Sequence, residues 1–286
     1  MAISDLGALS QAFAALVADT QKRVVSIGDA EGGRVSGFIW RTGLVVAAHE
    51  ALGDEDEFPV TLPDGSTTKG VLRGRDPSTD VALLTVSTGE FADWGPAPAP
   101  QVGALAFVVG RGESSPLATY GMIGEAGPAW RSMRGGQIDA RITLALRLPS
   151  RLEGGAVVDA EGKLIGMAVT GVGRRAIAIP VSTVERAVKT LSEKGYIPRG
   201  YLGVTLHPIE GKGVIVVGVA ENGPGTKAGL AIGDVITTWD GAAISGYRDL
   251  LHRVAGSAAG QTAKVGVLRG GNAIDLQIVV GERPRS

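Results

Sequence analysis

The chain contains no cysteine, so neither a disulfide framework, a thiol nucleophile nor a cysteine-ligated metal site can form. Aromatic residues make up only 5% of its 286 residues. No segment reaches the roughly 18 consecutive apolar residues that suggest a membrane-spanning helix. Neither sign of charge dominates, because 28 Lys+Arg face 29 Asp+Glu. This balance gives no electrostatic reason to expect nucleic acid or an anionic membrane as a partner.

Glycine, by contrast, is abundant, with 44 copies against 14 prolines. Between the glycine-containing turns lie many short runs rich in Val, Ile and Leu, and the segments PDGS (63–66) and DAEGK (159–163) are typical of hairpin turns. Short strands at this spacing predict a mainly β protein built as a barrel or sandwich. The length suggests about two domains, at roughly 150 residues each.

The amino-terminal segment lacks the basic region followed by a continuous apolar stretch that marks an export signal. Its apolar residues instead recur at helical spacing over residues 5–19, which predicts an amphipathic helix. We therefore expect a soluble, cytoplasmic protein, or a periplasmic or secreted one if a leader has been removed.

A second helix is predicted over residues 181–196, where Val184, Val188 and Leu191 fall along one face. Gly195 and Pro198 end it, because neither residue continues a helix well. We place the domain boundary here and expect domains at residues 1–196 and 197–286.

Two residues in the first domain suggest nucleophilic catalysis. GLVVAAHEAL (43–52) presents His49 just after an apolar strand, and RDPSTDVALLTV (75–86) presents Asp80 at the start of another. A serine triad takes its histidine and aspartate from such separate loops. A lone histidine is commonly structural and an aspartate opening a strand is commonly a turn residue. The AAH and D-x-A-L-L patterns together are more specific than either residue.

With GGAVVDAEGKLIGMAV, AIAIPVSTVERAV and GYLGVTL, these motifs make nearly the whole chain resemble HtrA/DegP-type serine proteases. The resemblance implies a chymotrypsin-like double β-barrel followed by a PDZ domain, a β-sandwich with two helices. It implies that His49 is the general base and Asp80 the residue that orients it. It also implies that a homo-oligomer, a trimer, can form through the protease domain, with the helix at residues 5–19 taking part.

The position of the nucleophile departs from the family pattern. Aligning on Gly154 and the residues that follow it places SRLEGGA over the family's GNSGGP motif. Glu153 then occupies the serine position. The resemblance assigns the oxyanion turn to Arg151, Leu152 and Gly154, with Arg151 where the family has a glycine.

This departure argues against ordinary proteolysis, because a glutamate is a weak nucleophile towards amides and leaves His49 no proton to abstract. Ser150 is the nearest alternative serine, at an awkward offset from the turn. Glu153 has two interpretations. It pairs with His49 and raises the pKa of the imidazole, or it points into solvent.

The resemblance also places a peptide-binding loop in the second domain. A PDZ module adds a peptide as a strand to an open sheet edge and holds its terminal carboxylate on backbone N–H groups. Leu206 and Val254 are open to interpretation as pocket or core. The residues expected to bind the peptide are Tyr201, Leu202, Gly203, Val204, Leu206, Leu251 and Val254.

Two functions follow. The first is a catalytically inactive HtrA-like protein that binds peptide C-termini or unfolded segments through its PDZ domain, as a scaffold, chaperone-like holder or regulator. The second is an active serine-type endopeptidase with a rearranged or unconventional nucleophile. The sequence contains no cofactor signature or metal-ligand cluster, so none is expected.

Overall fold

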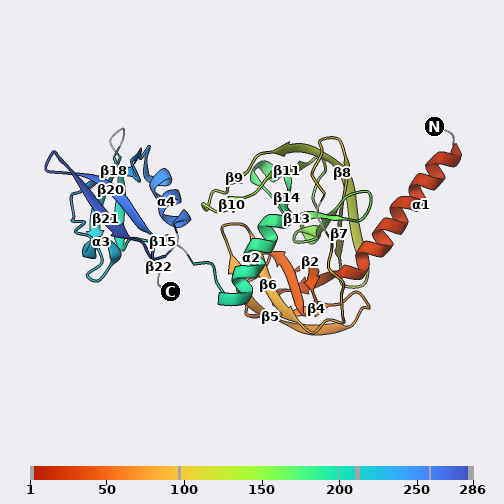
Figure 1. Ribbon diagram of the computed structural model, residues 1–286. Coiled ribbons are helices and arrows are strands. Elements are labelled where there is room, and N and C mark those ends of the chain that lie inside the picture. The colour runs from red at the N-terminus through yellow and green to blue at the C-terminus, as the bar shows by residue number, and fades with distance from the viewer. Residues whose placement is uncertain (1–2, 96–97, 199, 210–212, 258, 283–286) are drawn as a thin grey trace. The chain divides into compact units, whose positions relative to one another are not determined.

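The computed structural model describes residues 3–95, 98–198, 200–209, 213–257 and 259–282 (Figure 1). The chain divides into two compact units, Met1–Ile197 and Pro198–Ser286. The first contains two closed β-barrels, and the second contains a smaller β-sheet with helices. The predicted mainly β fold, a chymotrypsin-like double barrel followed by a PDZ domain, is confirmed.

The first barrel closes in the order β1-β2-β3-β6-β5-β4, with every pair antiparallel. Hairpin turns such as the one at Gly65, whose φ is +89°, join neighbouring strands. The strands are β1 (Val24–Gly28), β2 (Arg34–Arg41), β3 (Leu44–Ala48), β4 (Glu57–Thr61), β5 (Thr67–Asp76) and β6 (Val81–Val86).

Strand β3 shows why these runs are apolar at nearly every position. Val45 and Ala47 face the cluster inside the first barrel, whereas Val46 and Ala48 join a cluster that includes Phe107 and other residues of the second barrel. Successive side chains of a strand point to opposite faces, so both faces of β3 are buried. The two barrels therefore pack against each other through a shared apolar cluster, and each barrel also has a cluster of its own.

The second barrel closes in the order β11-β14-β13-β12-β7-β8. A short hairpin of β9 (Trp130–Arg131) and β10 (Gln137–Ile138) follows β8. The barrel strands are β7 (Leu105–Arg111), β8 (Pro116–Gly127), β11 (Arg141–Leu144), β12 (Ala156–Val158), β13 (Leu164–Thr170) and β14 (Ala176–Pro180). Two short 3-10 turns interrupt it, η2 (Ser150–Leu152) and η3 (Val172–Arg174).

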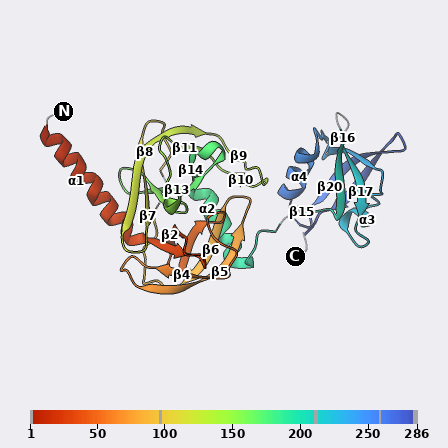
Figure 2. The same cartoon turned by 180° about the vertical axis from the view of Figure 1, so that it is seen from behind.

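Helix α2 (Val181–Lys194) packs its predicted apolar face into the shared apolar cluster, where Val184 and Leu191 are fully buried. Gly195 ends it in the left-handed conformation, and its N–H donates to the Leu191 carbonyl. Helix α1 (Ile3–Thr20) leads through η1 (Gln21–Arg23) into β1 and runs out from the barrels (Figure 2). None of the described helices is sufficiently long and apolar to span a membrane.

The second unit holds a sheet in the order β16-β17-β18-β20-β21, with β19 paired to β18 and a small sheet of β15 and β22. Its buried residues form a separate core that includes Val214, Ile236 and Val265. The elements are β15 (Gly200–Tyr201), β16 (Val204–Ile209), β17 (Gly213–Val219), α3 (Pro224–Lys227), β18 (Val235–Trp239), β19 (Ala242–Ala243), α4 (Tyr247–Gly256), β20 (Thr262–Arg269), β21 (Asn272–Val279) and β22 (Gly281–Glu282).

Candidate functional site

Strand register brings His49 and Asp80 together at one end of the first barrel. The antiparallel pairing of β3 with β6 ends at Ala48 opposite Val81. His49, which follows Ala48, therefore lies beside Asp80, which precedes Val81. The His49 N–H donates to the Asp80 carbonyl at 3.1 Å. The backbones of the two residues are therefore adjacent.

The side chains of these two residues are not arranged as a triad. The His49 ring is half-buried between two guanidinium groups, with Arg75 Nη1 at 3.4 Å from Nδ1 and Arg134 Nη1 at 3.4 Å from Nε2. Burial, followed by these two positive charges, lowers the pKa of His49 below its usual 6.5. The imidazole is thus held in its neutral form at neutral pH.

Asp80 directs its carboxylate elsewhere. Its Oδ1 accepts a hydrogen bond from the Glu50 N–H at 2.7 Å, and its backbone adopts a φ of +61°, which is uncommon outside glycine. Burial raises the pKa of Asp80 to about 7, against the hydrogen bond from Glu50. Asp80 therefore caps the turn after β3, and Arg75 takes the place beside His49 Nδ1 where a triad would have a carboxylate.

The segment at the serine position is fixed by the first barrel. The Ser36 hydroxyl donates to the Arg151 carbonyl at 2.6 Å, and the Ser36 N–H donates to the Glu153 carbonyl at 3.0 Å. Gly154 follows with a φ of +79°, and a side chain there would collide with the Ser36 carbonyl. Glycine is thus required at this position for both backbone shape and close approach.

The backbone N–H groups of residues 152–155 all donate within the protein, whereas that of Arg151 donates to no carbonyl of the described residues. Leu152 donates to the Pro149 carbonyl, and Glu153 donates to that of Ser150. The Gly154 N–H donates to the Ala168 carbonyl at 2.8 Å, and the Gly155 N–H donates to the Leu152 carbonyl at 3.0 Å. An oxyanion hole needs N–H groups that point at the reacting carbonyl oxygen. The amides of residues 152–155 are already committed to other acceptors.

The Glu153 carboxylate accepts a hydrogen bond from the Thr170 hydroxyl at the end of β13. Glu153 is half-buried, so it does not simply point into solvent. No ion pair joins it to His49 in the described part of the chain, and the His49 pKa moves down instead of up. The structure thus shows neither an ion pair with His49 nor a fully solvated side chain, and Glu153 instead contacts Thr170. Ser150 is exposed and makes no hydrogen bond to the His49 ring.

A cavity of about 470 Å³ lies beside Asp80. Side chains from the first barrel, from the β9–β10 hairpin and from the end of β13 line it. Its walls include Arg134 and Thr170, the residues that contact His49 and Glu153. The altered catalytic region therefore borders a space large enough for a small ligand or a peptide side chain.

In the second unit, the expected peptide-binding residues divide into core and surface. Leu202 is 3% and Val254 8% exposed, and both belong to the core. Tyr201, Val204 and Leu206 are half-buried, and Leu251 on α4 is exposed. Val204 and Leu206 on β16 and Leu251 on α4 thus remain accessible to a ligand.

Gly203 gives the loop before β16 its shape. Its φ is +70°, and a β-carbon would approach the Gly223 backbone to 2.9 Å. The Leu202 and Gly203 carbonyls accept from Gly225 and Ala220, whereas the N–H groups of Leu202 and Gly203 donate to no carbonyl of the described residues. Within the described residues, these two backbone donors beside the edge strand β16 therefore have no carbonyl acceptor.

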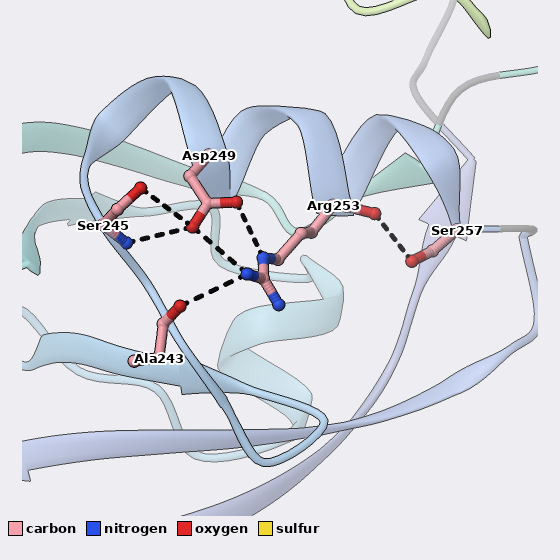
Figure 3. Close-up of polar contacts among 5 residues, drawn as sticks. All are labelled: Ala243, Ser245, Asp249, Arg253 and Ser257. Atoms are coloured by element: carbon pink, nitrogen blue, oxygen red, sulfur yellow. Dashed lines mark hydrogen bonds and ion pairs between the residues drawn. The ribbon is translucent and has the colours of Figure 1, made fainter. Parts of the chain in front are cut away.

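A polar network fixes the amino-terminal end of α4 (Figure 3). The Asp249 carboxylate accepts from the Ser245 N–H at 2.9 Å and from Arg253 Nε at 2.8 Å. Arg253 also donates to the Ala243 carbonyl. Arg253 lowers the pKa of Asp249 to about 2, helped by the Ser245 hydrogen bonds. This network positions the helix that carries Leu251.

Sequence reasoning missed Arg75, Arg134 and Thr170. Arg75 is one turn before Asp80 and Arg134 lies in a glycine-rich hairpin, so both look like ordinary surface charges. Thr170 follows a buried strand with no distinguishing motif. An excess of arginine near a catalytic motif is the one signal that could have drawn attention to the first two.

Comparisons with known proteins agree with this architecture. The trypsin-like peptidase domain family matches residues 35–167, and the PDZ domain family matches residues 200–280. A probable periplasmic serine endoprotease DegP-like from Brucella suis biovar 1 (strain 1330) is 30% identical over 273 residues, covering 87% of this chain and 52% of that protein. The chain is a DegP/HtrA homologue.

Other HtrA-type proteins show the same relationship. The DegP-like protein of Pseudomonas putida (strain ATCC 700007 / DSM 6899 / JCM 31910 / BCRC 17059 / LMG 24140 / F1) is 29% identical over 291 residues, covering 93% of this chain and 58% of that protein. The solved structure of the HtrA-type protease AlgW with a decapeptide superposes with a TM-score of 0.74 at 25% identity and covers 96% of this chain and 99% of that chain. The chain spans about half the length of the curated relatives it matches.

Proposed function

We propose that this HtrA homologue is catalytically inactive and binds peptide C-termini or unfolded segments through its PDZ domain, as a scaffold, chaperone-like or regulatory protein in protein quality control. The observation that carries the proposal is the turn at residues 152–155. It has Glu153 at the serine position, and its N–H groups donate to internal carbonyls.

Each catalytic component is altered. Acyl transfer needs a nucleophile beside a base, and the Glu153 carboxylate is hydrogen-bonded to Thr170 instead. The base needs a carboxylate to stabilise its imidazolium, and Arg75 supplies a positive charge at that position. The oxyanion needs free N–H donors, which residues 152–155 lack. These independent changes together support inactivity.

An activity assay tests this part of the proposal. We expect no turnover of casein or fluorogenic peptides and no labelling by a serine-reactive phosphonate. We also expect Glu153→Ser to stay inactive, because the turn amides and Arg75 are unchanged in that variant. Turnover or labelling by the unmodified chain that disappears in His49→Ala would contradict the proposal.

The N–H groups of Leu202 and Gly203, which have no carbonyl acceptor within the described residues, support carboxylate binding beside β16. The AlgW structure named above contains a decapeptide, which is consistent with peptide binding in this family. We propose that the peptide pairs with β16 and places its terminal side chain between Leu206 and Leu251.

Calorimetry with peptides that end in an apolar residue tests the PDZ site. A free carboxyl terminus should bind, and the amidated peptide should bind at least tenfold more weakly, about the effect of one charge-assisted hydrogen bond. Leu251→Glu should abolish binding. Leu268→Glu serves as the matched control, since the two leucines are 41% and 39% exposed. Equal binding of the free and amidated peptides would exclude this mode.

The compartment and assembly belong to the same proposal. The two curated relatives are named periplasmic, which favours the periplasmic alternative over the cytoplasmic expectation. The homo-oligomer expected from the resemblance would use the exposed apolar residues of α1.

A further inference from the structure

The cavity beside Asp80 has an apolar lining with exposed apolar residues at its edge. Met133 is 82% and Val172 73% exposed, and both line it. Exposed side chains of this kind favour contact with an apolar part of a ligand. The rest of the apolar lining comes from β10, β13 and β14, and consists of the buried residues Ile138, Val169 and Ile179 and the half-buried Ile177.

Three guanidinium groups line the same cavity, from Arg134, Arg141 and Arg175. Arg134 is paired with Glu50 at 2.9 Å. Arg141 lies over the ring of Trp130, 5.0 Å from its centroid. Neither Arg141 nor Arg175 forms an ion pair with a carboxylate in the described part of the chain. Two positive charges at this cavity are therefore uncompensated by a direct partner.

The acidic residues of the lining offset these charges incompletely. Glu50 is already engaged by Arg134, and burial raises the pKa of Asp80 to about 7, which weakens the negative charge of this carboxyl near neutral pH. Glu125 is the remaining carboxylate of the lining. The cavity thus combines an apolar wall with two unpaired guanidinium groups against one unpaired carboxylate, a balance that favours an anion.

We propose that this cavity binds a glutamate or aspartate side chain of an extended peptide segment whose neighbouring residues are apolar, separately from the PDZ groove. Arginine pairs strongly with carboxylates, and the apolar walls and edge would contact the flanking residues. This inference rests on the proposed peptide-binding function and adds a second, internal-sequence site to it.

Peptides that are acetylated and amidated test the cavity alone, because they lack the terminal carboxylate that the PDZ site requires. A Val-Glu-Leu segment is compared by calorimetry with Val-Gln-Leu and Val-Lys-Leu on the full chain. We expect the glutamate peptide to bind about tenfold more tightly than the glutamine peptide, the effect of one charge-assisted hydrogen bond. Tighter binding of the lysine peptide would overturn the proposal, because the carboxylates would then dominate.

Two adjacent arginines provide a matched pair of variants. Arg175 lines the cavity and Arg174 does not, although both are exposed. Arg175→Gln should remove the preference for glutamate over glutamine, and Arg174→Gln should keep it. Equal losses in the two variants would show a general effect of charge and refute a site at the cavity. Free glutarate should compete only weakly; binding as tight as that of the peptide would refute the peptide as occupant.

The outcomes separate this inference from the PDZ function. If Arg175→Gln leaves binding of free C-termini unchanged while removing the glutamate preference, the two sites are distinct. If amidated peptides do not bind at all but free C-termini do, the cavity proposal fails and the PDZ proposal stands. If binding of free C-termini is lost while the glutamate preference is retained, the PDZ proposal fails and the cavity proposal stands.

Discussion

His49 is held neutral by burial and by guanidinium groups on both of its ring nitrogens. Asp80, beside it in the backbone, is buried and retains its proton up to about pH 7. A working triad has the opposite arrangement, with an ionised aspartate stabilising the imidazolium. Both residues thus have their charge suppressed by their surroundings.

Replacing Arg75 should reverse part of this effect. In Arg75→Met we expect the pKa of His49 to rise, because a nearby positive charge that disfavours the imidazolium is removed. An NMR titration of His49 measures it. Arg73→Met is the control, since Arg73 lies on the same strand and donates to the Ser192 carbonyl. A His49 pKa that stays the same or falls in Arg75→Met would contradict the assignment.

Asp80 makes stability depend on pH. From about pH 4 to pH 7 the folded state keeps a proton on Asp80 that the unfolded state releases, so the free energy of unfolding falls as the pH rises through this window. Asp80→Asn removes that loss, retains an oxygen for the Glu50 N–H, and tolerates the positive φ.

We expect Asp80→Asn to be more stable than the unmodified chain above about pH 7, by on the order of 2–4 kcal/mol, and to show little gain near pH 4. Urea unfolding at the two pH values measures this difference. Asp240→Asn is the control, because exposed Asp240 also has a positive φ and accepts from a backbone N–H. A gain independent of pH would point to backbone relief instead of proton linkage.

Helix α4 depends on a polar network at its first turn as well as on the apolar residues Leu250 and Val254. The Asp249 carboxylate fixes the preceding loop through Ser245 and the helix through Arg253. The lowered pKa of Asp249 means that its contribution is present above about pH 4 and is lost as the pH falls through about 2.

Asp249→Ala should therefore destabilise the PDZ domain by about 1 kcal/mol and weaken peptide binding, because the α4 side of the groove loses its anchor. Calorimetric unfolding and the C-terminal peptide assay measure the two effects. Asp275→Ala is the matched control, since its ion pair with Lys264 is exposed. An equal effect of both changes would mean that the network does not position α4.

In the first unit, the carboxyl-terminal part of helix α1 packs against the second barrel, whereas its amino-terminal part is exposed. Phe13 makes edge contacts with Phe107 at 4.8 Å and Tyr120 at 5.1 Å, whereas Leu6 and Leu9 are 52% and 42% exposed. Apolar residues at this spacing on an extended helix favour contact with another molecule.

In the homo-oligomer proposed above, changing Leu6 and Leu9 together to glutamate should lower the sedimentation-derived mass while the separated chain stays folded. The reason is that these side chains contribute little to the core of a single chain. Val102→Glu, at an apolar position 64% exposed elsewhere, is the control. If the unsubstituted protein already sediments with the mass of a single chain, self-association through α1 is ruled out.

The sequence predicts the architecture well because strand and helix periodicities record burial directly. The apolar face of α2 follows from such a pattern. The direction in which a side chain points does not follow from these patterns. Arg75 approaches His49 from across the barrel end, and Glu153 finds Thr170 on β13. Neither partner is encoded by spacing, and the direction of the turn amides depends on backbone angles that no residue pattern specifies.

The capping role of Asp80 bears on how such a site is interpreted. The hydrogen bonds of Asp80 and His49 close the turn after β3, and they do so whatever chemistry the protein performs. A histidine and an aspartate at these two positions therefore contribute to folding and are not by themselves a sign of catalysis.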